Sequence, residues 1–147
     1  MKYSQAKQGR VFIIRLEDGD IIHEEIERLA KTESVNAASL IIVGGADEGS
    51  SLVVGPEDGR SQPVNPMVHV LDNVHEVVGT GTLFPNDQNE PKLHMHIAGG
   101  RKSTTVTGCV RHGVKAWHIL EIIMIELVGA TATRVPDPIT GFELLNP

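Results

Sequence analysis

A series of short apolar runs, separated by turn-forming residues along almost the whole chain, constrains the fold more than any other feature. β-Branched side chains dominate these runs, and Gly, Pro, Asp and Asn fill the gaps, which is typical of strands joined by tight turns. The last run is long enough for a helix, but its isoleucines and the turn at Gly113 favour a long, buried strand. We predict strands over residues 10–16, 37–43, 50–54, 67–71, 75–83, 93–98, 103–110 and 116–128.

One segment shows helical rather than strand spacing. Apolar side chains recur at helical intervals at Ile22, Ile26, Leu29 and Ala30, and charged residues occupy most of the positions between them. Asp20 precedes this segment and is placed to cap its N-terminus. The sequence therefore predicts one main amphipathic helix.

A single helix among many short strands predicts an α+β fold with a mostly antiparallel β-sheet. The chain has 147 residues, which suits one domain, and we assign all of residues 1–147 to it. Only 3% of the residues are aromatic, so the core must be built from Val, Ile, Leu and Ala.

Charge and cysteine content restrict the partners and the compartment. Acidic residues outnumber basic residues 19 to 13, which predicts weak binding to nucleic acid because phosphate contacts need Lys and Arg. The one cysteine excludes an intrachain disulfide and, with no apolar run near the N-terminus, indicates a reducing cytoplasm. Glu121 and Glu126 interrupt the longest apolar stretch, so no membrane role is expected.

The segment 93–98 (LHMHIA) alternates apolar residues with histidine. In a strand, His94 and His96 project from the same face, with their Cβ atoms about 6.5 to 7 Å apart, so both imidazoles can reach one ion. Zinc favours such nitrogen ligands. A His-x-His pattern taken alone is more often a solvated or hydrogen-bonded pair than a metal site, so a third donor is needed.

The hairpin that follows offers this third donor. If its turn is centred between Arg101 and Lys102, Cys109 lies opposite His94 on the same face. His112 then faces away, unless a bulge near a glycine resets the alternation, so the residues leave Cys109 and His112 as alternatives. A lone cysteine is, by contrast, often a small buried hydrophobe.

Other histidines and acids are weaker candidates. His118 lies inside an apolar run and is predicted to be a hydrogen-bonded core residue, whereas His69 and His75 are predicted to face solvent. Glu121 and Glu126 are predicted to lie at a sheet rim or a subunit interface. Neither a phosphate-binding glycine loop nor a G-x-S-x-G nucleophile motif is present.

The order of these segments resembles the PPC (plants and prokaryotes conserved) domain in its free-standing prokaryotic form, and the similarity spans nearly the whole chain. Its most specific element is the His94-x-His96 strand with a downstream Gly before the third ligand. Further matching pieces are Arg15-Leu16 with Gly19, Glu76 with Gly79, residues 113–127 (GVKAWHILEIIMIEL) and Thr140-Gly141-Phe142.

This resemblance implies a homotrimer that binds a divalent metal, zinc by preference, and whose cellular role is not established. Members of the family carry a third histidine after a Gly-Gly pair; here that position is Cys109, preceded by Thr107-Gly108, so the implied ligands are His94, His96 and Cys109. DNA association is attached to the family through plant AT-hooks, whose Arg-Gly-Arg-Pro core is absent here.

A metal-dependent enzyme is the alternative function. The PPC fold is similar in outline to that of acetolactate decarboxylase, which also uses a zinc held by histidines, and this resemblance implies a lyase or hydrolase that acts on a small molecule. In that case Glu121 or Arg15 would be candidate acid-base or anion-binding partners.

Overall fold

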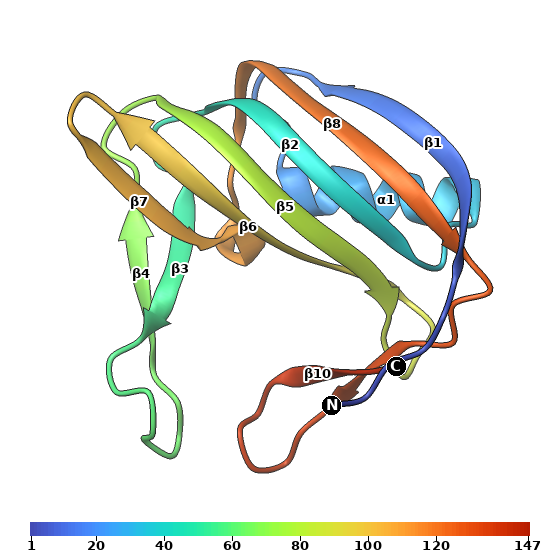
Figure 1. Ribbon diagram of the computed structural model, residues 1–147. Coiled ribbons are helices and arrows are strands. Elements are labelled where there is room, and N and C mark those ends of the chain that lie inside the picture. Colours follow the sequence, from blue (N-terminus) through green and yellow to red (C-terminus); the bar gives the residue numbers. More distant parts are fainter.

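An eight-stranded antiparallel sheet forms the body of the molecule in a computed structural model that describes all of residues 1–147. Figure 1 shows the curved sheet with the single α-helix packed against one of its faces. The strand order is β1-β8-β2-β5-β6-β7-β3-β4. The elements are β1 (Lys7–Leu16), α1 (Ile22–Glu33), β2 (Ala38–Ala46), β3 (Ser51–Pro56), β4 (Pro66–Val70), β5 (His75–Pro85), β6 (Pro91–Arg101), β7 (Thr104–Cys109), the 3-10 helix η1 (Val110–His112), β8 (Ala116–Val128), β9 (Thr133–Pro136) and β10 (Glu143–Asn146).

The predicted α+β fold with a mostly antiparallel sheet and one main helix is confirmed. All eight predicted strands are present, and β8 has the predicted bounds. The prediction missed β9 and β10, which pair as a separate two-stranded sheet in the Pro-containing C-terminal segment. Two such short strands flanked by proline and glycine leave too weak a periodicity to be seen in the sequence.

Helix α1 buries Ile22, Ile26 and Ala30 against the sheet, as their spacing predicts. Asp20 does not cap the helix, contrary to the prediction. Ile21 occupies the N-cap position, and the Asp20 side chain instead accepts a hydrogen bond of 2.8 Å from the backbone N–H of Glu17. The aspartate therefore stabilises the turn before the helix, a local side-chain-to-backbone bond that competes with capping.

The main core lies between α1 and the inner face of the sheet, where 22 buried apolar residues form one cluster. The opposite, outer face of the sheet is much more open: Ile13, Ile41 and Val43 are 86%, 58% and 56% exposed. Within the single chain, strand β8 is therefore buried on its inner face and open on its outer face.

A bulge interrupts the pairing of β2 with β8. Gly44 pairs with Leu120 while Gly45 pairs with Trp117, so β8 carries extra residues at this point. Gly44 has φ of 142°, and a Cβ there would lie 2.1 Å from the carbonyl oxygen of Ile119. Only glycine fits this close approach of two backbones.

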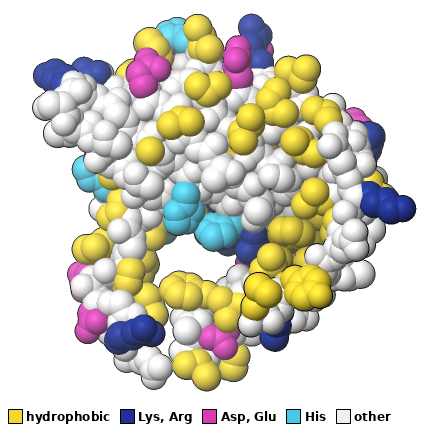
Figure 2. All heavy atoms as spheres, in the orientation of Figure 1, with side chains coloured by type: hydrophobic (Ala, Val, Ile, Leu, Met, Phe, Trp, Pro, Cys, Tyr) yellow, Lys and Arg dark blue, Asp and Glu magenta, His cyan; other side chains and the backbone are white.

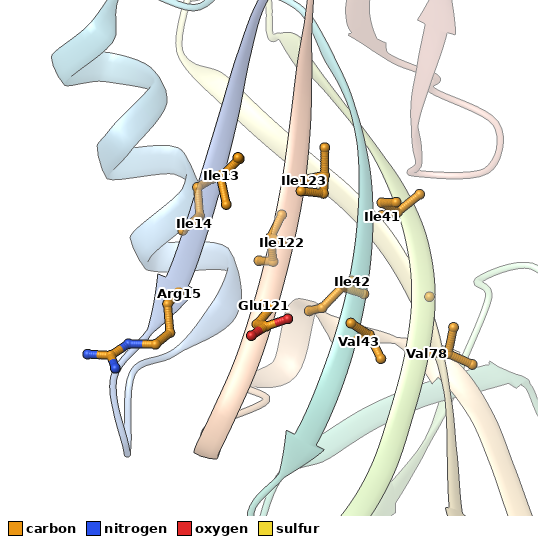
Figure 3. A pocket seen from close by; sticks show the side chains of 11 residues that line it. Ile13, Ile14, Arg15, Ile41, Ile42, Val43, Val78, Glu121, Ile122 and Ile123 are labelled. Carbon is orange, nitrogen blue, oxygen red and sulfur yellow. The ribbon is translucent and has the colours of Figure 1, made fainter.

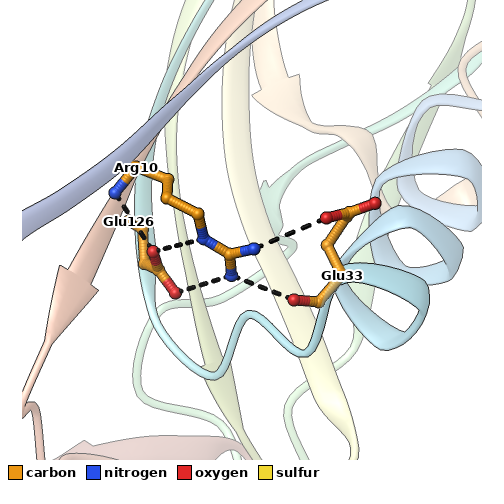
Figure 4. Close-up of polar contacts among 3 residues, drawn as sticks. All are labelled: Arg10, Glu33 and Glu126. Atoms are coloured by element: carbon orange, nitrogen blue, oxygen red, sulfur yellow. Dashed lines mark hydrogen bonds and ion pairs between the residues drawn. The ribbon is translucent and has the colours of Figure 1, made fainter.

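Arg10 joins three elements at one end of the sheet (Figure 4). Its guanidinium donates hydrogen bonds to the Glu126 carboxylate on β8 at 2.8 and 2.9 Å, and to the Glu33 carbonyl of α1 at 2.9 Å. These contacts hold the end of the helix beside β1 and β8. None of the helices is both long enough and apolar enough to span a bilayer.

Candidate metal centre

Strand β6 separates its apolar residues from its histidines. Leu93, Met95 and Ile97 are buried in the core at 2%, 0% and 1% exposure, whereas His94 and His96 project from the outer face. The alternation follows from the period of two in an extended strand. The prediction that both histidines share one face is therefore met.

The two imidazoles converge. Their Nε2 atoms lie 3.1 Å apart, with ring centroids 5.0 Å apart and ring planes at 78°. Figure 2 shows two adjacent histidine side chains at the rim of an opening in the surface, with a Lys or Arg side chain beside them. Without a metal, one ring N–H can donate a hydrogen bond to the other ring, and which ring donates depends on the tautomers.

Cys109 completes the cluster from strand β7. It lies opposite His96, not opposite His94 as predicted, because the hairpin turn falls between Lys102 and Ser103. The predicted register was wrong by two positions, a shift that leaves every side chain on the same face. The donor atoms of His94, His96 and Cys109 all lie within 4.8 Å of one another.

The alternative donor, His112, lies in η1 and is exposed, outside this cluster. The chain leaves the strand after Cys109, because the 3-10 helix begins at Val110. The alternation of a strand therefore no longer determines where His112 points.

The donor set fits a zinc ion. Tetrahedral zinc with bond lengths of about 2.0 to 2.3 Å separates its ligand atoms by roughly 3.3 to 3.6 Å. The histidine nitrogens, at 3.1 Å, are slightly closer than this, and all the donor atoms lie within 4.8 Å, so side-chain adjustments alone can bring the three donors to a tetrahedral spacing. Two imidazoles and a thiolate are a borderline-soft set of the kind that zinc prefers.

The surroundings favour a neutral His94. Burial lowers the pKa of His94, and the positive charges of Arg134, of protonated His96 and of Arg111 lower it further. A neutral imidazole keeps a lone pair available for a metal, whereas an imidazolium has none.

Two arginines lie at this site although no pattern in the sequence predicted them there. Arg134 of β9 is only 4% exposed, and its Nη2 donates a hydrogen bond of 3.1 Å to Thr82 Oγ1. Arg111 of η1 donates a hydrogen bond of 3.2 Å to the carbonyl of Leu93. Each arginine is isolated in the sequence, and only the tertiary fold brings it to the histidines.

The remaining histidine predictions had mixed outcomes. His69 on β4 is exposed as predicted, but His75 is 5% exposed, with its Nδ1 2.9 Å from the carbonyl oxygen of Asn73. Alternation along β5 explains this burial, because His75 shares the inner face with Val77. His118 is exposed rather than in the core, because it lies in the β8 bulge with φ of 47°.

The two acids have different environments. Glu126 is paired with Arg10 at the end of the sheet, whereas Glu121 is exposed on the outer face, directly opposite Arg15. Strand β8 is three strand spacings from β6, or roughly 14 Å. Within one chain, therefore, neither Glu121 nor Arg15 can act on a group bound at His94 and His96.

Comparison with known proteins identifies the family. The model of the Plants and Prokaryotes Conserved (PCC) domain matches residues 3–128 of the chain. The chain belongs to the PCC family. The match covers the helix and all eight strands of the main sheet, and the predicted resemblance is confirmed.

Solved structures share the PCC fold from end to end. The crystal structure of a metal-containing protein from Archaeoglobus fulgidus has a TM-score of 0.85 and 22% identity, with 100% of both chains covered. A plant- and prokaryote-conserved protein of Pyrococcus horikoshii has a TM-score of 0.82 and 20% identity, again over 100% of both chains. A protein of Ralstonia eutropha named "Putative DNA-binding protein" has a TM-score of 0.70 and 21% identity, over 99% of this chain and 96% of that one.

The chain is also similar to part of a larger protein. The bifunctional protein GlmU of a Synechococcus strain is 25% identical over 134 residues, which make up 90% of this chain but 19% of that protein. The chain therefore spans about a fifth of this relative.

Proposed function

We propose that this PCC chain is a zinc-binding protein that acts as a homotrimer. The observation that carries the proposal is the convergence of His94, His96 and Cys109 from two adjacent strands within 4.8 Å. The structurally similar protein of Archaeoglobus fulgidus is described as metal-containing, which supports a metal role for the fold. Zinc is the metal that best matches two imidazoles and a thiolate.

The outer face of the sheet supports the trimer. Ile13, Ile41, Val43, Val78 and Ile123 line a shallow apolar hollow across β1, β8, β2 and β5 (Figure 3). Figure 2 shows hydrophobic side chains spread over this face. A contiguous apolar surface of this kind is typical of a protein interface, and other copies of the chain are its proposed occupants.

This apolar face is continuous with the proposed metal centre. Residues directly opposite one another in adjacent strands project from one face, and one such row runs across six strands. The row consists of Ile13, Ile123, Ile41, Thr80, His96 and Cys109. A trimer built through this face would therefore bring a neighbouring copy close to the metal.

Metal analysis of the purified chain tests the proposal. We expect about one zinc per chain and a particle mass three times the chain mass of 15.9 kDa. His94→Ala should lose the zinc, because the strand pair then offers only one imidazole. His69→Ala is the matched control, since it removes an exposed histidine outside the cluster. Equal zinc content in all three proteins would defeat the proposal.

A metal-dependent enzyme is the second candidate, and the number of protein donors favours it. Three protein ligands leave one position of a tetrahedral zinc for water or substrate, and zinc in such a position activates water or polarises a carbonyl. X-ray absorption at the zinc edge distinguishes the two roles. Three protein ligands plus a light oxygen donor would favour the enzyme, whereas a closed shell of protein ligands would favour a structural or regulatory role.

DNA binding is a weaker candidate, supported by the name of the relative from Ralstonia eutropha. The formal charge of -6 opposes it, because phosphate contacts depend on Lys and Arg. We expect the chain to pass through a DNA column at about 150 mM salt, where exposed charges are substantially screened. Retention on the column at this salt concentration would support DNA binding.

A further inference from the structure

Arg134 is an almost fully buried cation with an incomplete set of partners. The residue is 4% exposed, its Nη2 donates to Thr82 Oγ1, and its Nε has no hydrogen-bond partner. Its guanidinium also lies 6.0 Å from the ring centroid of Phe84. Buried polar groups in native proteins are nearly always hydrogen-bonded, and an unpaired donor on a buried charge is costly. The orphan Nε therefore points to a ligand that supplies an acceptor.

The register of the sheet places this cation beside the proposed metal centre. Thr82 on β5 is the direct partner of His94 on β6, and their side chains share the outer face. Directly opposite residues have Cβ atoms about 4.5 to 5.5 Å apart. Arg134 is thus in hydrogen-bond contact with the residue next to a proposed metal ligand.

A second arginine approaches the same centre from η1. Arg111 donates to the carbonyl of Leu93, the residue before His94, and its Nη1 lies 3.7 Å from Glu143 Oε2. Arg111 lowers the pKa of Arg134, after the larger effect of burial, so the two cations repel each other. Glu143 offsets only part of this charge, and a zinc ion would add more.

A purely structural role explains part of this arrangement. Arg134 and Thr82 tie the β9–β10 hairpin to the main sheet, and a salt bridge joins Arg111 to Glu143 on β10. Holding the hairpin to the sheet needs only one cation, and it does not explain why the Nε of Arg134 has no hydrogen-bond partner. Two arginines close together are more easily understood if an anion sits between them.

We propose that Arg134 and Arg111 form an oxyanion subsite beside the His94–His96–Cys109 centre, which binds the carboxylate or phosphate group of a small molecule. That the subsite lies beside a metal rests on the proposed function, whereas the pairing of the two arginines does not depend on the proposed function. A guanidinium presents a planar fork of N–H donors, which suits both kinds of oxyanion. The subsite thereby narrows the ligand of this centre to small anionic molecules.

Calorimetric titration of the full-length chain tests the subsite, with oxalate and inorganic phosphate as separate probes that distinguish the two oxyanions. Each probe is titrated into the zinc-loaded and the metal-free protein. We expect at least one probe to bind, and Arg134→Gln to weaken its binding roughly tenfold or more, as the loss of a charged hydrogen bond does. Arg111→Gln should weaken it in the same direction. Arg60→Gln is the matched control, since it removes one positive charge from an exposed loop.

Zinc content and thermal unfolding are measured on the same samples. If Arg134→Gln unfolds, Arg134→Lys and Arg111→Gln are used to test the subsite instead. Arg134→Lys keeps the positive charge but loses the planar fork of N–H donors. If the wild-type chain holds no zinc, the proposed function is wrong but the subsite is not. The subsite is then tested on the metal-free protein, where binding of a probe must still depend on the two arginines. Absence of binding in both forms, or equal binding by wild type and the folded Arg134 and Arg111 variants, would overturn the subsite.

Discussion

His96 and Cys109 lie directly opposite each other in the β6–β7 ladder, on the outer face of the sheet. The Cys109 thiol therefore lies at the position on β7 from which a side chain can bind the same metal ion as the His96 imidazole. Because the pairing of β7 with β6 ends at Cys109, the position of its sulfur depends on the last rung of the hairpin.

The thiol should be a metal ligand that an imidazole can replace. We expect Cys109→Ser to reduce zinc affinity by at least about tenfold, since losing even an outer partner of a metal ligand has an effect of this size. Cys109→His should keep zinc, because both groups are competent ligands. Competition with a chromophoric chelator measures the affinities. Thr107→Ser, on the same face of β7, is the control, and unchanged affinity in Cys109→Ser would exclude the thiol.

Removal of the metal should lower the stability of the folded chain. A ligand that binds only the folded state adds about 2.7 kcal/mol when its free concentration is a hundred times its Kd. We therefore expect a chelator to lower the thermal midpoint of the wild type but not that of His96→Ala. Calorimetry with and without chelator gives both midpoints. A wild-type midpoint indifferent to the chelator would speak against a bound metal.

The apolar outer face should hold the copies together. Ile41 is 58% exposed at the middle of this face, so Ile41→Lys should leave the core intact and yet place a charge in the proposed interface. We expect a shift from trimer to monomer in light scattering coupled to gel filtration. Ile139→Lys, at a residue 70% exposed in the C-terminal segment, should stay trimeric. A monomeric wild type would contradict the prediction outright.

The Arg10–Glu126 pair should make stability depend on pH in the acid range. Hydrogen bonds from Arg10 lower the pKa of Glu126 from 4.5 to about 2. Because the folded pKa is depressed, the stabilisation is fully present above pH 4.5 and is lost as the pH falls toward 2. Urea unfolding of wild type and Glu126→Gln should give curves that differ at neutral pH and converge at acid pH. Glu25→Gln, which removes a carboxylate from an ion pair within the helix, is the comparison variant.

The bulge at Gly44 should tolerate no side chain. Gly44→Ala would place a Cβ 2.1 Å from the Ile119 carbonyl oxygen at φ of 142°, so the backbone must move. We expect a loss of about 3 kcal/mol or more in the free energy of unfolding. Gly59→Ala, with nothing within 4 Å of the added Cβ, should be close to neutral. Urea unfolding of both variants makes the comparison.

Much of the proposed metal centre could be predicted, because its key feature is local. Alternation along residues 93–97 requires that His94 and His96 share one face, whatever strands lie beside them. The register of the hairpin could not be predicted, because it depends on where the turn forms. The face of the sheet from which Cys109 projects was predicted correctly although the register was wrong. The register error was an even number of residues, and such a shift leaves each side chain on its face.

The errors arose where tertiary structure overrides a local pattern. His118 lies in an apolar run, but the bulge opposite the glycines of β2 turns it outward. Arg134 and Arg111 carry no local signal, since an isolated arginine in a polar segment usually faces solvent. They reach the centre only because the β9–β10 hairpin and η1 fold against the sheet.

The sequence by itself determined the strands, the amphipathic helix and the shared face of the two histidines, because side-chain periodicity is a property of consecutive residues. Tertiary structure alone decided the partner of Cys109, the burial of Arg134 and the open apolar face. Each of these depends on contacts between segments far apart in the chain, and such contacts are selected by the packing of the whole sheet and not by any one run of residues.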